Sequence, residues 1–279
     1  MMKKHLIYLI FTLLATTVLV TAQIYLILNY YETDIALYAS GTSLPTVFNI
    51  SLVSCVVIVI TSLFVMKNEN FSETLPTVKS FTVFASAMCG LILSASVLMG
   101  FYKILMQDFS RPVSVQEIFN FISLICAAIA SAYFFVLALK TEPYKIQNAF
   151  FGLFIVIWAA FRLMTEYFDV TSPLNNPIKI LHQISYIAIM MFFLYEAGYS
   201  ADIKKPKLYA VGGYLAIIFT FTSSLPIIIL NISKLKFINT NTFSYIVELC
   251  LAFFVLVRML TLYKKVNKKR RRYKHYYEK

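Results

Sequence analysis

The stretch at residues 118–139, IFNFISLICAAIASAYFFVLAL, decides the fold class of this chain. It contains no charged residue, and a helix of this length spans the roughly 30 Å hydrocarbon core of a membrane. Further apolar stretches fill most of the chain, approximately at residues 6–30, 47–66, 81–106, 149–165, 178–193, 208–230 and 243–263. These continuous runs exclude a closed β-barrel, whose strands would alternate over about ten residues. The sequence therefore predicts an all-α integral membrane protein, a bundle of eight transmembrane helices.

The basic residues predict the orientation of this bundle. Lys and Arg are alternately abundant and scarce in successive gaps, and most of the 25 basic residues belong to the N-terminal segment, every second loop and the C-terminal segment. Basic residues in short loops are retained in the cytoplasm during membrane insertion. We therefore expect the N-terminus and the C-terminus to be cytoplasmic. Abundant Lys, Ile, Asn, Tyr and Phe indicates an AT-rich bacterial genome, so the expected location is the cell (inner) membrane.

A cleaved signal peptide is the alternative interpretation of the N-terminus. Lys3 and Lys4, the apolar run behind them and the small-residue triplet at 20–22 are typical of such a peptide. Cleavage would leave seven spans and an outer N-terminus. The apolar character continues past the triplet through Ile24 to Leu28, which favours a first helix that stays in the protein.

Composition places any activity inside the bundle. The chain has 279 residues, 59% of them hydrophobic, and no loop is long enough to fold as a soluble domain. We expect a transmembrane domain at 1–263 and a polybasic cytoplasmic tail at 264–279. The net charge of +12 lies mostly on one membrane face, so no nucleic acid is expected as a partner.

The tail is predicted to bind anionic lipid of the inner leaflet, at about 1 kcal/mol for each basic residue near the surface. Docking of another membrane or cytoplasmic protein is the alternative. The residues expected to contact lipid are Lys264, Lys265, Lys268, Lys269, Arg270, Arg271, Arg272 and Lys274.

Motifs for catalysis or for metal binding are missing from the sequence. It contains no H-E-x-x-H, P-loop, G-x-S-x-G or dinucleotide fingerprint. The cysteines all fall inside predicted spans, and the three histidines are scattered: Cys55, Cys89, Cys126 and Cys250, and His5, His182 and His275. No spacing among them suits a metal site. We therefore expect no metal and no cofactor, and we assign no catalytic residue.

Ionisable side chains within the predicted spans concentrate in the second half of the chain. Each is costly in hydrocarbon and usually faces the bundle interior or a water-filled cavity. Arg162 and Glu166 follow Trp158 at steps of four residues, and Asp169 follows three residues later, which places them on one helical face. The sixth and eighth stretches each add a polar stripe: Lys179, His182, Ser185 and Tyr186, then Tyr245 and Glu248.

These side chains are expected at similar depth in the outer part of the membrane, where they would form an outward-facing polar pocket. Their mixture of carboxylates, guanidinium and imidazole suits a small polar or zwitterionic ligand, or protons. Internal pairing of the same charges without any ligand is the alternative. The pocket residues predicted are Arg162, Glu166, Lys179, His182, Tyr186, Tyr245 and Glu248.

Two further features have a structural and a functional interpretation. Glu196 and Arg258 are expected to form an inner ion pair, either as a static clamp or as a gate between two helices. The loop at 166–178 contains turn residues, and it could also cover the pocket as a lid. The acidic outer residues are expected to be ordinary solvated charges of loops or helix ends: Glu32, Asp34, Asp108 and Glu117.

Three classes of function agree with these features. The first is a non-enzymatic sensor or accessory subunit that binds a ligand in the outer pocket and signals through the last helix to the tail. The second is a transporter of small solutes or lipids that uses the same pocket. The third is an intramembrane enzyme in which His182 with Glu248 or Glu166 performs acid–base chemistry.

Overall fold

The computed structural model describes residues 2–65, 80–106, 113–139, 146–201, 203, 205–236, 238 and 240–262. These residues form eight helices and one short antiparallel hairpin: α1 (Met2–Tyr30), β1 (Tyr31–Glu32), β2 (Leu37–Tyr38), α2 (Leu44–Val65), α3 (Ser80–Leu105), α4 (Val115–Leu139), α5 (Ile146–Tyr167), α6 (Pro177–Ser200), α7 (Pro206–Ser233) and α8 (Thr242–Leu262). All eight helices are long and apolar enough to cross a membrane. The prediction of an all-helical, multi-pass membrane protein is confirmed. The predicted polybasic tail lies outside the described residues.

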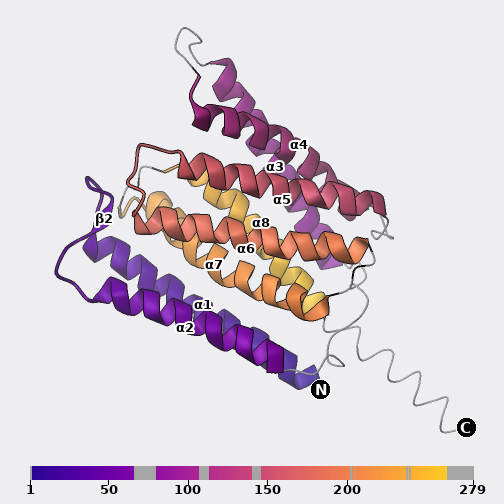
Figure 1. The fold of residues 1–279 in the computed structure, drawn as a ribbon, viewed down its shortest axis with the longest axis horizontal. Helices are drawn as coiled ribbons and strands as arrows, with labels where there is room; N and C mark the ends of the chain where they lie inside the picture. Colours follow the sequence, from indigo (N-terminus) through magenta and orange to yellow (C-terminus); the bar gives the residue numbers. More distant parts are fainter. Residues whose placement is uncertain are drawn as a thin grey trace, which may run out of the picture.

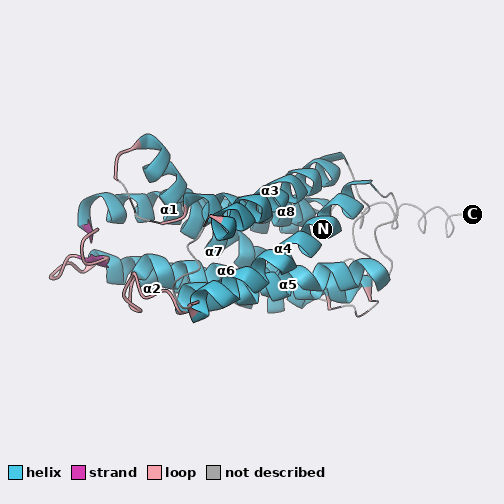
Figure 2. Ribbon diagram, turned by 90° about the horizontal axis from the view of Figure 1, so that it is seen from above, coloured by secondary structure: helices cyan, strands magenta, loops and turns pink. Residues whose placement is uncertain are grey.

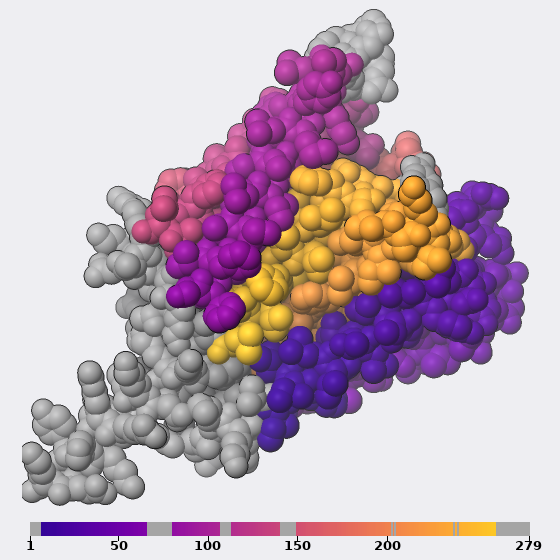
Figure 3. Space-filling view, turned by 180° about the vertical axis from the view of Figure 1, so that it is seen from behind, coloured from indigo at the N-terminus to yellow at the C-terminus, as the bar shows by residue number. Residues whose placement is uncertain are grey.

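The helices are arranged as a ring of six with an outlying pair. Helices α3 to α8 pack against each other in chain order, and α8 closes the ring by packing on α3. The pair α1 and α2 packs against α7 from outside the ring (Figure 1). From behind, α7 and α8 lie between α3 on one side and α1 on the other (Figure 3). Helix α7 is the most buried span, because it contacts α1, α2, α6 and α8.

Glycines allow the close packing of α7. A Cβ atom on Gly212 would come within 3.2 Å of the backbone of Phe192 in α6. A Cβ atom on Gly213 would lie 2.5 Å from the sulfur of Met259 in α8. Small residues at such positions let helix backbones approach each other in a membrane. These two glycines therefore let α6 and α8 pack closely against α7.

The connections that carry polar residues gather at one end of the bundle. The start of α1 and the end of α8 lie together at the other end (Figure 1), and Figure 2 places both strands at the end with the polar connections. We call the end with the strands and the polar connections the hairpin end. Its assignment to the outside of the cell stays a prediction from the distribution of basic residues.

Helices α5 and α6 extend beyond the stretches predicted for them. The sixth stretch was expected to end near residue 193, whereas α6 continues to Ser200 and includes the buried Glu196. The helix continues because the charge of Glu196 is paired inside the protein rather than at the membrane boundary. At its start, the side chain of Asn176 accepts hydrogen bonds from the backbone N–H groups of Ile178 and Lys179, which is a helix N-cap.

Lys236 ties the hairpin to the rest of the hairpin end. Its ammonium group donates hydrogen bonds to the carbonyl oxygens of Ile27, at 2.7 Å, and of Tyr31. These carbonyls belong to the last turn of α1 and the residue after it, where no helical donor is left for them. The side-chain amide of Asn176 donates to the Tyr31 hydroxyl at 3.3 Å. Burial raises the pKa of the Tyr31 phenol, so the phenol stays neutral in this contact.

Candidate functional site

A polar cavity of about 1020 Å³ opens at the hairpin end of the bundle. We call it the polar cup. Helices α4, α5, α6 and α8 and Lys103 of α3 contribute to its lining, together with the hairpin and the connections between α5 and α6 and between α7 and α8. It is lined by five of the pocket residues predicted from the sequence: Arg162, Glu166, Lys179, His182 and Tyr245. The other two, Tyr186 and Glu248, contact this lining from behind.

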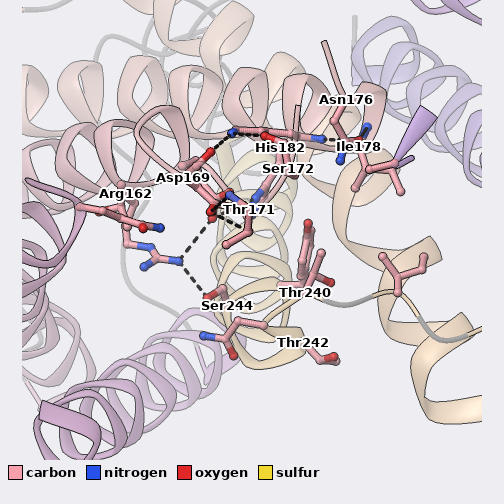
Figure 4. A pocket seen from close by; sticks show the side chains of 18 of the residues that line it. Arg162, Asp169, Thr171, Ser172, Asn176, Ile178, His182, Thr240, Thr242 and Ser244 are labelled. Carbon is pink, nitrogen blue, oxygen red and sulfur yellow. Dashed lines mark hydrogen bonds and ion pairs between the residues drawn. The ribbon is translucent and has the colours of Figure 1, made fainter. Parts of the chain in front are cut away.

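Arg162 is held at the floor of the cup by neutral groups from three helices. Its guanidinium donates to the hydroxyl of Ser244 at 2.9 Å, to the side-chain oxygen of Asn120 at 3.3 Å and to the hydroxyl of Tyr186 at 3.4 Å. Figure 4 shows Arg162 pointing toward Ser244. The nearest carboxylate oxygen, on Glu166, is 3.7 Å from Nη2, which is too long for a hydrogen bond. The two charged groups therefore lie close together without a direct hydrogen bond between them.

His182 connects the cup to a carboxylate buried among the helices. Its Nδ1 lies 3.6 Å from Oε1 of Glu166, and its Nε2 contacts Oε1 of Glu248 directly. The Glu248 residue is 0% exposed, whereas 22% of the Glu166 side chain is accessible. The ring of Tyr245 stacks on the imidazole at a centroid distance of 4.3 Å. The structure therefore brings these side chains together, and their depth in the membrane and their roles stay predictions.

Two hydroxyl groups complete the surroundings of Glu248. Ser185 in α6 donates to Oε2 of Glu248 at 2.8 Å, and Ser224 in α7 lies 3.4 Å from the same oxygen. Ser224 stands two residues before Pro226, which lies inside α7 and removes one backbone hydrogen bond of that helix. The buried carboxylate is thus held by α6, α7 and α8 together.

The connection between α5 and α6 forms a fixed wall of the cup. Asp169 follows the end of α5 at Tyr167, so it does not continue the helical face of Arg162 as the spacing had predicted. Instead, its carboxylate accepts hydrogen bonds from the backbone N–H and the hydroxyl of Thr171, at 2.9 and 2.7 Å. The ammonium of the buried Lys179 donates to the carbonyls of Asp169 and Ser172. These hydrogen bonds hold the connection in one conformation. That this loop covers the cup as a lid stays a prediction.

Several residues of the cup were not singled out from the sequence. Asn120 and Ser244 orient Arg162, yet a single amide and a single hydroxyl in apolar surroundings carry no specific signal. Asp34 and Glu117, expected to be ordinary solvated loop or helix-end charges, both line the cup. Glu117 accepts a hydrogen bond from the backbone N–H of Ser114 at 2.8 Å, which agrees with a charge at a helix end. Asp108, named in the same prediction, lies outside the described residues.

Glu196 and Arg258 form a second ionic contact, away from the cup. Both side chains are buried, at 2% and 0% exposure, and they contact each other directly between α6 and α8. The guanidinium also lies 6.0 Å from the centre of the Phe254 ring. At 1.5 Å per residue, Arg258 lies about 15 Å further along α8 than Glu248. The structure thus brings the predicted inner pair together at the end of the bundle opposite the cup.

The side chains of the cup are not arranged as a metal site. Among the described residues, no group of three or more His, Cys, Asp or Glu side chains could hold a metal ion. The arrangement instead offers ionic and hydrogen-bonding partners for a small molecule, and an acid–base group in contact with a buried carboxylate. A comparison with protein families, with curated proteins and with solved structures found no match for this chain.

Proposed function

We propose that this protein is a membrane-embedded sensor or accessory subunit that binds a small zwitterionic ligand in the polar cup. The observation that carries this proposal is the loose pairing of Arg162 with Glu166 at 3.7 Å. Arg162 is oriented by neutral hydroxyl and amide groups, so its guanidinium can exchange one of them for a ligand carboxylate. The Glu166 carboxylate lies 3.7 Å from the guanidinium and 3.6 Å from the imidazole, beyond normal hydrogen-bond length, and can accept a shorter hydrogen bond from a ligand ammonium group.

The size of the cup supports a ligand of this kind. Its volume of about 1020 Å³ lies at the upper end of the range for small-molecule sites, roughly 300 to 1,000 Å³. The lining also provides hydroxyl and amide groups that can fix the orientation of a ligand, such as those of Thr165, Asn176 and Thr242. Because charges of both signs lie at the floor, the cup favours a molecule with both a positive and a negative charge. A simple anion or cation would fit less well.

We also propose how the protein is oriented in the membrane and how it transmits ligand binding. The distribution of basic residues supports a cup that faces outward and termini in the cytoplasm, with the chain in the cell (inner) membrane. Helix α8 contributes Ser244, Tyr245 and Glu248 to the site, and the tail at 264–279 follows directly after its end. A ligand that displaces Ser244 from Arg162 would act on the outer part of α8. The tail would transmit this change to anionic lipid or to a partner protein.

A transporter is the second candidate, supported by the proline inside α7. Helix α7 is continuous, but Pro226 removes one of its backbone hydrogen bonds close to the contact of Ser224 with Glu248. Weakened or broken helices at a buried polar site are typical of transporters. In this case the pair of Glu196 and Arg258 would have to open as an inner gate. Uptake of labelled solute into liposomes that contain only this protein would support the transporter and contradict the sensor.

Ligand binding can be tested with protein purified in lipid nanodiscs. A panel of zwitterionic amino acids, compared with uncharged polyols of similar size, is screened for an increase in melting temperature. The variant Arg162→Gln is expected to weaken binding about ten- to hundredfold, because hydrogen bonds to charged groups contribute about 1.5 to 3 kcal/mol. The exposed Lys234→Gln at the same end is the matched control and should bind normally. Binding that is equal in all three proteins would place the ligand outside the cup.

A further inference from the structure

Three acid–base side chains form a row from the polar cup into the interior of the membrane domain. Glu166 borders the cup with 22% of its side chain exposed, the His182 side chain is 2% exposed, and the Glu248 side chain is fully buried. Each nitrogen of the imidazole faces a carboxylate. Nδ1 lies 3.6 Å from Glu166, and Nε2 contacts Glu248. An imidazole that faces a carboxylate on each side can receive a proton at one nitrogen and release one from the other.

We propose that Glu166, His182 and Glu248 form a relay that carries a proton from the polar cup to a binding site shared by His182 and Glu248. A proton taken up by the Glu166 carboxylate passes to Nδ1, while Nε2 releases its own proton to the Glu248 carboxylate. The imidazole is neutral before and after this step, and the net result is one proton moved inward. The gap of 3.6 Å closes when the partly exposed Glu166 carboxyl rotates, since transfer needs about 2.6 to 3.2 Å or one bridging water.

The charges around the site favour a proton there. Two carboxylates, of Glu166 and Glu248, face the permanent charge of Arg162 and the imidazole of His182. Lys179 adds a further cation beside Glu166, and the carboxylate of Asp169 lies in the same cup. With the imidazole charged these six groups are neutral together, whereas loss of its proton leaves one net negative charge, which is costly in a membrane interior. The three acid–base groups are therefore expected to share one proton.

The other groups that face the imidazole cannot replace the relay. The ammonium of Lys179 from α6 donates to two backbone carbonyls. The ring of Tyr245 stacks on the imidazole, and the ring of Tyr186 lies tilted against it. Helix α7 contributes a neutral hydroxyl, that of Ser224. Beyond Glu248, the next ionic contact is that of Glu196 with Arg258, about 15 Å further along α8 at 1.5 Å per residue. The proton site is thus accessible from the cup side and is closed toward the opposite end.

A proton at this site would act on the contact between α6 and α8. These helices are joined at one end by His182 with Glu248 and at the other by Glu196 with Arg258. Transfer of the proton from the imidazole to the Glu248 carboxylate replaces a hydrogen bond to a charged carboxylate by a hydrogen bond between two neutral groups. The second contact includes a guanidinium that does not deprotonate. The outer contact would therefore respond to the proton, whereas the inner contact would not.

The proposal does not depend on a ligand, so the protein alone can be tested. The chain has three histidines, and a background with His5→Gln and His275→Gln leaves His182 as the single imidazole. Nitrogen NMR follows this imidazole while infrared spectroscopy follows protonated carboxyl groups, from about pH 4 to pH 9. We expect the imidazole signal and one carboxyl signal to change together in one shared step. In Glu248→Gln the carboxyl signal should disappear and the imidazole step should move.

Matched variants and a sidedness test make the outcome decisive. The exposed Glu32→Gln is the control and should leave both signals unchanged. If Glu248→Gln does not fold, Ser185→Ala removes the hydrogen bond to the Glu248 carboxyl and should shift its infrared band in an otherwise intact protein. In proteoliposomes of defined orientation, a pH jump on the cup side should change the imidazole signal, and a jump on the other side should not. Independent steps for His182 and Glu248, no step at all, or a response from both sides would each overturn the proposal.

Discussion

Replacing Glu196 with Gln is expected to destabilise the protein by about 3 to 5 kcal/mol, the usual cost of removing one partner of a buried ion pair. The substitution keeps the shape of the side chain but leaves Arg258 charged at 0% exposure. A guanidinium cannot release its proton to reduce this cost. The cost should therefore stay constant with pH.

The reverse substitution, Arg258→Met, should behave differently. The Glu196 carboxylate that remains can take up a proton and become neutral, which the guanidinium left by Glu196→Gln cannot do. Uptake of this proton costs less free energy at lower pH, so at pH 5 the Arg258→Met variant is expected to be more stable than Glu196→Gln. The double variant, which removes both charges, should recover most of the stability lost by either single change.

The assay is reversible unfolding in mixed detergent micelles, with wild type, both single variants and the double variant measured at pH 7 and pH 5. The coupling energy of this double-mutant cycle isolates the contact of Glu196 with Arg258. A coupling below about 1 kcal/mol, the range of exposed ion pairs, would refute a buried clamp. If the stabilities of the two single variants depend equally on pH, the explanation given for their difference is refuted.

The remaining predictions concern the hairpin end of the bundle. Lys236→Met should remove the hydrogen bonds to the last turn of α1, and hydrogen exchange of the 31–38 hairpin should become faster while that of α7 stays unchanged; equal exchange in the variant would contradict this role. In a background without cysteines, Glu166→Cys should react with a membrane-impermeant thiol reagent added from outside, and Glu248→Cys should stay protected. Protection at both positions would show that the cup is not open to water from that side.

The sequence by itself determined the class of the fold and the positions of the spans. Hydrocarbon accepts only long apolar helices, so continuous apolar runs such as 118–139 are sufficient to predict membrane helices. The same cost explains why Arg162, His182 and Glu248 could be selected as residues that face the interior. The ends of α5 and α6 were less predictable, because Glu196 looked like a boundary charge until its buried partner was known.

The tertiary structure alone decided which of these side chains meet, and at what distance. Helix spacing orders residues along one helix but carries no information on its rotation against a neighbour. The loose contact of Arg162 with Glu166 and the direct contact of His182 with Glu248 therefore depend on how α5 packs against α6, and on how α6 and α8 pack around the glycines of α7. The same packing assigns Asn120 and Ser244 to the cup, because their importance comes from the guanidinium they contact rather than from any pattern in their own surroundings.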